Sequence, residues 1–291
     1  MAGVGVISAA AGLAATLAMV VSAAEVETLA VEEHPGMAKG GTIETKVNNM
    51  SQNLEQTVRQ FTEDVTRIYG ESLLCLILYG SAASGEYVDG RSNINCLVLL
   101  KEVTPDELRK CAAKLPEWHK QGISTPLFVD PAYVRSSIDV FPVEFLDMKQ
   151  RYRVLYGKDF LQELELKPER LRFQCEQELK GKMLRLRQVY LEASQTESRL
   201  VALLVKSTSS FMVLFRALLH LQGTPAPQSM NEILVALSQL GLRTEAMGRV
   251  HTLRRKESAL KPAEIDLLFR QYLSEIQAVV KFVEKTNAVS L

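Results

Sequence analysis

The segment from Leu73 to Leu100 constrains the fold of this chain more than any other. It consists of an apolar run, a Gly-Ser turn, a polar loop and a second apolar run. The first run, Leu73 to Tyr79, is too short for a typical helix and is rich in aliphatic residues, which predicts a buried strand. Gly80-Ser81 follows, where glycine permits a tight backbone turn. A second strand is expected from Asn93 to Leu100.

The predicted second strand carries two polar residues on one face. Asn93 and Asn95 are separated by one residue, so their side chains lie on the same side of a strand, and Ile94 points to the other side. This order of strand, Gly-Ser turn, loop and strand resembles the nucleotidyltransferase superfamily, in particular its minimal and kanamycin-nucleotidyltransferase-like members. The resemblance implies that Gly80 and Ser81 bind nucleotide phosphates.

The same resemblance identifies a departure from the family pattern. The family places Asp-x-Asp on the second strand to hold magnesium, and this chain has Asn93-Ile94-Asn95 there. Magnesium prefers oxygen ligands, usually carboxylates and phosphates, and an asparagine amide brings no charge. Losing two carboxylates at a partly buried site weakens metal binding by on the order of several kcal/mol. We therefore expect a nucleoside triphosphate as ligand, weak or absent magnesium binding, and impaired transfer activity.

A third carboxylate of the family lies on a later strand. The segment from Phe141 to Leu146 is expected to form such a strand, and Glu144 is the residue matched to the family's metal ligand or general base. Asp139 and Asp147 are weaker matches. The alternative interpretation of Glu144 is a residue on the strand surface.

The polar loop adds further candidates. Arg91 is a candidate for binding nucleotide phosphate, since a guanidinium fits phosphate oxygens. Glu86 and Asp89 are candidates for partial replacement of the missing carboxylates. The alternative for all three is a solvated loop charge.

The 291 residues are long enough for more than one domain. We expect an apolar N-terminal segment and linker over residues 1–49, a nucleotidyltransferase-like domain over 50–160 and a helical domain over 161–291. The fold class is α+β, a mixed sheet with flanking helices followed by an antiparallel helical bundle. From Pro168 onward the apolar residues repeat at helical spacing with short connections, which indicates that bundle. A protein partner or a homodimer through this domain is a candidate interaction.

The N-terminal segment from Val4 to Ala24 is apolar and rich in alanine, and the first basic residue is Lys39. A secretory signal has a positive region before its apolar core. Three interpretations stay open for this segment: a disordered tail or overextended start, a membrane anchor, and a cleaved signal.

Charge and cysteine content narrow the classes of partner and the cellular compartment that the sequence predicts. Thirty-four basic and 34 acidic residues give no net charge, so the balance does not predict a nucleic-acid partner. The four cysteines show no metal-binding spacing. They predict reduced structural thiols and a cytoplasmic protein. The functional alternatives are a non-catalytic nucleotide- or partner-binding protein, an active magnesium-dependent transferase that passes a nucleotidyl group to an acceptor, and an interaction protein with a vestigial cleft.

Overall fold

The computed structural model describes residues 43–85, 87, 92–224, 227, 229–254 and 262–286. Val4 to Ala24 and the loop residues Glu86, Asp89 and Arg91 lie outside this part of the chain. The chain divides into two compact units. The first comprises Met1–Ser137 and Arg151–Leu164, and the second comprises Ile138–Gln150 and Glu165–Leu291.

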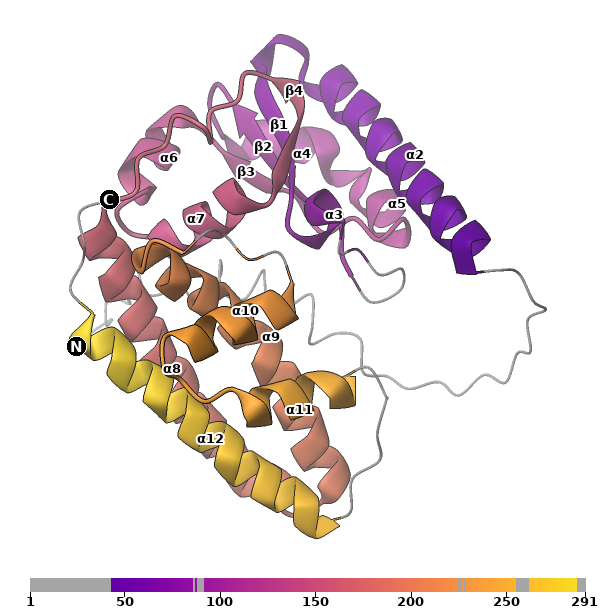
Figure 1. Ribbon diagram of the computed structural model, residues 1–291. Coiled ribbons are helices and arrows are strands. Elements are labelled where there is room, and N and C mark those ends of the chain that lie inside the picture. Colours follow the sequence, from indigo (N-terminus) through magenta and orange to yellow (C-terminus); the bar gives the residue numbers. More distant parts are fainter. Residues whose placement is uncertain are drawn as a thin grey trace, which may run out of the picture. The chain divides into compact units, whose positions relative to one another are not determined.

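The first unit contains the sheet and its helices (Figure 1). In chain order its elements are α2 (Ile43–Tyr69), a 3₁₀ turn η1 (Gly70–Ser72), β1 (Leu73–Tyr79), α3 (Ser81–Ser84), β2 (Asn95–Leu100), α4 (Pro105–Ala112), α5 (Leu115–Lys120), β3 (Leu127–Val129), α6 (Pro131–Ser137) and β4 (Tyr152–Gly157).

The sheet has four strands in the order β3-β2-β1-β4. β1 pairs antiparallel with both β2 and β4, and β2 pairs parallel with β3. The sheet is therefore mixed, as predicted. The regular second strand begins at Asn95, and Ile94 forms an isolated bridge to Ile123 just before it.

One face of the sheet packs against α2, α4 and α5. Its core includes Leu76, Leu78, Cys96 and Val98 of the strands, with residues of these helices such as Phe61, Cys111 and Trp118. Residues on the opposite face, such as Ile77 and Leu97, are also fully buried. Burial on both faces explains why β1 and β2 appear in the sequence as continuous apolar runs instead of alternating ones.

Three local features of this unit are not evident from the sequence pattern. α2 begins at Ile43, so Ser51, a residue type that often caps helices, lies inside the helix. The segment after β2 forms two helices, α4 and α5, and Thr104 caps the first by accepting a hydrogen bond from the Glu107 amide. Strand β4 has half-exposed side chains that give no strong apolar pattern.

The second unit is helical. It consists of α7 (Pro142–Gln150), α8 (Pro168–Ala193), α9 (Glu197–Leu221), α10 (Met230–Gln239), α11 (Glu245–Arg254) and α12 (Pro262–Lys285). α8 and α12 run antiparallel, since Lys180 pairs with Glu284 at one end and Tyr190 contacts Asp266 and Phe269 at the other. A single apolar core joins all these helices. The expected α+β architecture with a helical bundle is confirmed.

The prediction of a strand from Phe141 to Leu146 is wrong. The segment forms α7, with Pro142 in its first turn, where the missing amide hydrogen of proline does no harm. Most of α7 is buried on every side, so the segment lacks the apolar periodicity that distinguishes an amphipathic helix.

Among the described helices, α9 is long and apolar enough to cross a membrane by length and composition. About half of that stretch, 53%, is buried inside the protein. Because α9 packs against α8 and supplies core residues such as Phe215 and Leu218, a core helix of the bundle accounts for its composition.

Candidate functional site

Gly80 forms the turn that ends β1. Its φ of +78° and ψ of −149° lie in a region that is essentially restricted to glycine. Its amide donates a hydrogen bond to the Arg151 carbonyl over 2.9 Å, and its carbonyl accepts from the amides of Ala83 and Ser84. The turn is therefore fixed on one side by the residue preceding β4 and on the other by α3.

The amides of Ser81 and Ala82 follow directly after this turn. The first amides of a helix have no carbonyl acceptor within that helix. Neither of these two has an acceptor elsewhere among the described residues. Successive amides in such a turn form a concavity that attracts anions. The sequence prediction that Gly80 and Ser81 form a phosphate-binding turn thus has a suitable backbone geometry.

Asn95 lies beside the turn. It pairs with Tyr79, the residue before Gly80, in the β1–β2 register. A Cβ added at Gly80 would lie 3.5 Å from Asn95 Nδ2. The structure therefore brings together the Gly-Ser turn and one of the two asparagines that the sequence placed near it.

Asn93 lies one residue before the Ile94 bridge. Asn93 and Asn95 are half-buried, whereas Ile94 between them is buried in the sheet core. The predicted alternation of these three residues is confirmed. Ile94 is held on the neighbouring chain segment, because its amide donates to the Gly122 carbonyl and its carbonyl accepts from the Ser124 amide.

Arg151 is a candidate that the sequence analysis did not identify. Its carbonyl accepts the Gly80 amide hydrogen bond, and the next residue, Tyr152, pairs with Tyr79. The chain thus places an arginine backbone directly against the turn, and guanidinium groups suit phosphate recognition. Only the pairing of β4 with β1, a contact between residues far apart in the chain, reveals this proximity. Arg91, the arginine that the sequence favoured, lies outside the described residues.

Glu144 lies on α7 in the helical unit, whereas Gly80, Ser81, Asn93 and Asn95 belong to the sheet unit. Its carboxylate accepts a hydrogen bond from Gln174 Nε2 over 2.7 Å. Burial is the main cause, and the nearby Glu178 carboxylate the second, of a rise in the pKa of Glu144 to about 7. The side chain is therefore engaged within the bundle, and the alternative prediction of a residue on a strand surface is wrong, because Glu144 is buried on a helix.

The donor atoms at the expected metal position do not suit magnesium. Asn93 and Asn95 offer neutral amides, whereas magnesium prefers charged oxygen ligands such as carboxylates. Within the described part of the chain, no group of three or more His, Cys, Asp or Glu side chains is arranged to hold a metal ion. We therefore assign no chemical step to a metal at this site.

The cysteines are structural. All four are free and buried. Burial raises the pKa of Cys75 to about 11 and that of Cys175 to about 12. The Cys75 and Cys175 thiols are therefore protonated at neutral pH. All four cysteines pack as small apolar side chains.

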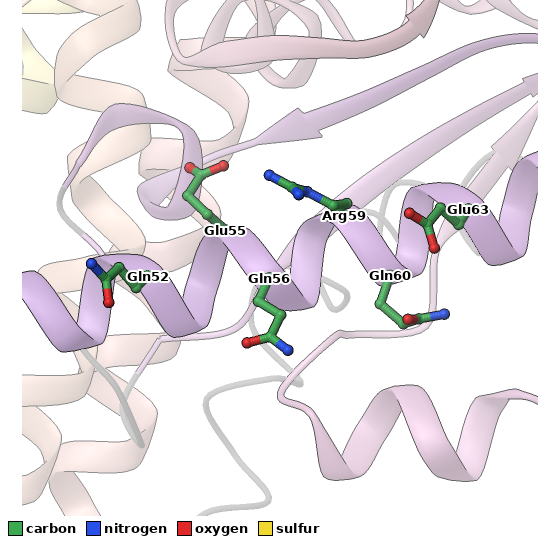
Figure 2. A pocket seen from close by; sticks show the side chains of 6 residues that line it. All are labelled: Gln52, Glu55, Gln56, Arg59, Gln60 and Glu63. Carbon is green, nitrogen blue, oxygen red and sulfur yellow. The ribbon is translucent and has the colours of Figure 1, made fainter.

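A hollow lies along the outer face of α2. Figure 2 shows the six side chains that line it, Gln52, Glu55, Gln56, Arg59, Gln60 and Glu63. All six are exposed and come from one helix. Glu55 forms an ion pair with Arg153 on β4 at 2.7 Å. None of the candidate site residues lines this hollow, so it is separate from the Gly-Ser turn.

The chain matches no protein-family model and no curated protein. Among solved structures it is similar to spectinomycin adenyltransferase AAD(9) from Enterococcus faecialis with ATP and spectinomycin. The two chains are 11% identical, the match covers 77% of this chain and 99% of that chain, and the TM-score is 0.48. We base the proposals below on the geometry of this chain, because a likeness at this level carries no information about activity.

Proposed function

We propose that this chain is a nucleotidyltransferase-like protein that binds a nucleoside triphosphate without a resident magnesium ion, in a regulatory or assembly role. The observation that carries the proposal is the Gly80 turn beside Asn95. A glycine-only backbone conformation is followed by two successive amides that have no acceptor among the described residues, and an uncharged amide side chain lies next to the glycine.

The chemistry of the site favours anion binding over catalysis. Backbone amides contribute partial positive charge that can hold phosphate oxygens without a metal. Replacing the two family aspartates by Asn93 and Asn95 removes two negative charges that would repel a triphosphate in the absence of magnesium. The same replacement removes the ligands that nucleotidyl transfer needs to position and activate its reactants. A site of this composition binds the nucleotide and leaves it intact.

Calorimetric titration tests this proposal. ATP, GTP, CTP and UTP are titrated into the full chain with and without magnesium. We expect micromolar binding of at least one nucleotide, with a dissociation constant that changes less than about threefold when magnesium is added. Incubation with labelled nucleotide under the same conditions is expected to give no transfer product.

A pair of serine variants locates the site. Ser81→Glu places a carboxylate at the turn and is expected to weaken binding at least about tenfold through charge repulsion. Ser136→Glu, on the exposed surface of α6 in the same unit, is the matched control and is expected to bind as the unmodified chain does. Binding that requires magnesium would overturn the metal-free interpretation in favour of a transferase. No binding of any nucleotide would favour an interaction protein with a vestigial cleft.

A further inference from the structure

α8 exposes three large apolar side chains to solvent. Phe173, Leu184 and Leu191 are 60%, 57% and 72% exposed. Single exposed leucines are ordinary on protein surfaces, but aligned ones indicate a contact surface. The spacing of these three residues decides whether they are isolated surface side chains or an aligned contact surface.

The three residues lie on one face of the helix. Phe173 and Leu184 are eleven residues apart and Leu184 and Leu191 seven, which correspond to about three and two turns at 3.6 residues per turn. They form a line about 27 Å long at 1.5 Å per residue. We call these three residues the α8 stripe. The core residues of α8, such as Leu179 and Leu186, lie on the opposite face.

Gly181 lies on the flank beside the middle of the stripe, where the lack of a side chain leaves room for another helix. A Cβ added at Gly181 would have no heavy atom within 4 Å. The Lys180 ammonium is drawn to the side by Glu176 at 2.7 Å and Glu284 at 2.9 Å. Its aliphatic stem therefore extends the apolar surface between Phe173 and Leu184.

The stripe is complementary to itself. Phe173 and Leu191 are equally far from Lys182, so a two-fold axis near Lys182 places Phe173 of one copy on Leu191 of the other. The same operation brings the exposed Gln177 beside Gln188 of the second copy. It also brings Arg187 beside Glu176 of the second copy. Arg187 has no acidic partner among the described residues of its own chain.

We propose that a second copy of this chain docks antiparallel on the α8 stripe, forming a two-fold symmetric dimer. An isologous contact uses the same patch on both copies, and a residue at one end must suit the residue at the other end. The apolar pair at the two ends and the opposite charges on one flank satisfy this condition. The proposal does not depend on nucleotide binding.

Light scattering during size-exclusion chromatography tests the oligomeric state of the full chain. We expect a mass near twice 32.4 kDa at concentrations of about 100 µM. Leu184→Lys places a charge in the stripe, facing Lys180 of the second copy, and is expected to raise the dimer dissociation constant at least about tenfold. Leu267→Lys on α12, where the leucine is 52% exposed, is the matched control and is expected to leave the dimer unchanged. A chain that stays monomeric throughout, or a dimer that Leu184→Lys does not weaken, would overturn the proposal.

Disulfide trapping tests the orientation. The double variant F173C/L191C places a thiol opposite a thiol at both ends of an antiparallel pair, and we expect a covalent dimer on mild oxidation. In each single variant the two new thiols lie about 27 Å apart across the axis, so no covalent dimer is expected. The native cysteines are all buried and do not compete. Covalent dimers formed as readily by the single variants would exclude the antiparallel arrangement.

Discussion

Gln174 holds Glu144 by a hydrogen bond of 2.7 Å from its side-chain amide to Glu144 Oε2. The same nitrogen donates to Glu178 Oε1 over 2.8 Å, and the side-chain oxygen of Gln174, Oε1, accepts a hydrogen bond from the Val143 backbone amide. One side chain on α8 thus joins the first turn of α7 to two carboxyl groups. The arrangement places the buried Glu144 carboxyl group close to that of Glu178, and both burial and this like charge disfavour ionisation of Glu144.

Glu144→Gln is expected to stabilise the helical unit at alkaline pH. The pKa of Glu144 is raised from 4.5 to about 7 in the folded state. Its contribution to stability is therefore fully present below pH 4.5 and is lost as the pH rises through 7. A shift of this size corresponds to about 3 kcal/mol at pH 8, and glutamine keeps an oxygen that accepts from Gln174.

Urea unfolding followed by far-UV circular dichroism, at pH 4 and pH 8, checks this prediction. The stabilisation by Glu144→Gln should be large at pH 8 and should nearly vanish at pH 4. Glu163→Gln, an exposed acid outside the bundle, serves as the control and should show no such pH dependence. An equal effect of Glu144→Gln at both pH values would show that ionisation of this residue is not linked to folding.

The Glu144 neighbourhood also shows where sequence reasoning stops. The β1 and β2 strands were predictable because aliphatic runs of strand length end at a turn, and Gly80 is required there by its backbone angles. α7 was not, because a helix buried on all sides has no polar face to mark its period. Pro142 was the available signal, since proline suits the first turn of a helix better than the interior of a strand.

Arg151 and β4 illustrate the second limit. β4 is an edge strand with half-exposed side chains, so local sequence gives it no clear apolar alternation. Its pairing with β1 joins residues more than seventy positions apart, as Tyr79 with Tyr152. The helices from α8 onward were easier to predict than α7, because their apolar residues recur at helical spacing and short loops connect them.

Gly157→Ala is expected to disrupt the sheet unit. Gly157 has a φ of +79°, and an added Cβ would lie 2.0 Å from the Leu74 carbonyl oxygen on the paired strand. Backbone atoms must move to relieve such a clash, and we expect a loss of more than about 3 kcal/mol in unfolding free energy. Trp118 is the single tryptophan and is buried in this unit, so its fluorescence during urea unfolding reports the loss.

Gly70→Ala is the control that measures the cost of backbone strain without the steric clash expected for Gly157→Ala. Gly70 also has a positive φ, +48°, but an added Cβ would meet nothing within 4 Å. Its substitution should cost only about 1–2 kcal/mol, the usual cost of a left-handed alanine. Similar losses at the two positions would mean that the contact with Leu74 is relieved without cost.

Glu275 should be needed for the start of α11. From α12 its two carboxylate oxygens accept hydrogen bonds from the amides of Ala246 and Met247, each at 2.9 Å. Glu275→Ala leaves both buried amides without acceptors and is expected to cost about 2–4 kcal/mol. Glu275→Gln retains one acceptor oxygen, so its loss of stability should lie between zero and the loss caused by Glu275→Ala.

Thermal unfolding followed by circular dichroism ranks the stabilities of these variants. Glu284→Ala removes an exposed ion-pair partner of Lys180 and serves as a near-neutral control. A neutral Glu275→Ala would show that water replaces the carboxylate.

Aspartates in place of Asn93 and Asn95 should create a site that binds a divalent metal ion. Asn93→Asp with Asn95→Asp places two carboxylates on the side of β2 where Asn95 lies beside Gly80. Without metal, their mutual repulsion should lower the unfolding free energy by about 1–2 kcal/mol. With manganese, calorimetry should show metal binding tightened at least about tenfold over the unmodified chain, since two charged oxygen ligands replace neutral amides.

Asn53→Asp with Asn231→Asp adds the same charge at exposed helical positions and controls for net charge. If the double aspartate variant bound manganese no better than this control, the two asparagines would not be what limits metal binding at this position. The remaining shell, including the Gly80 turn, would then be unsuited to a cation on its own.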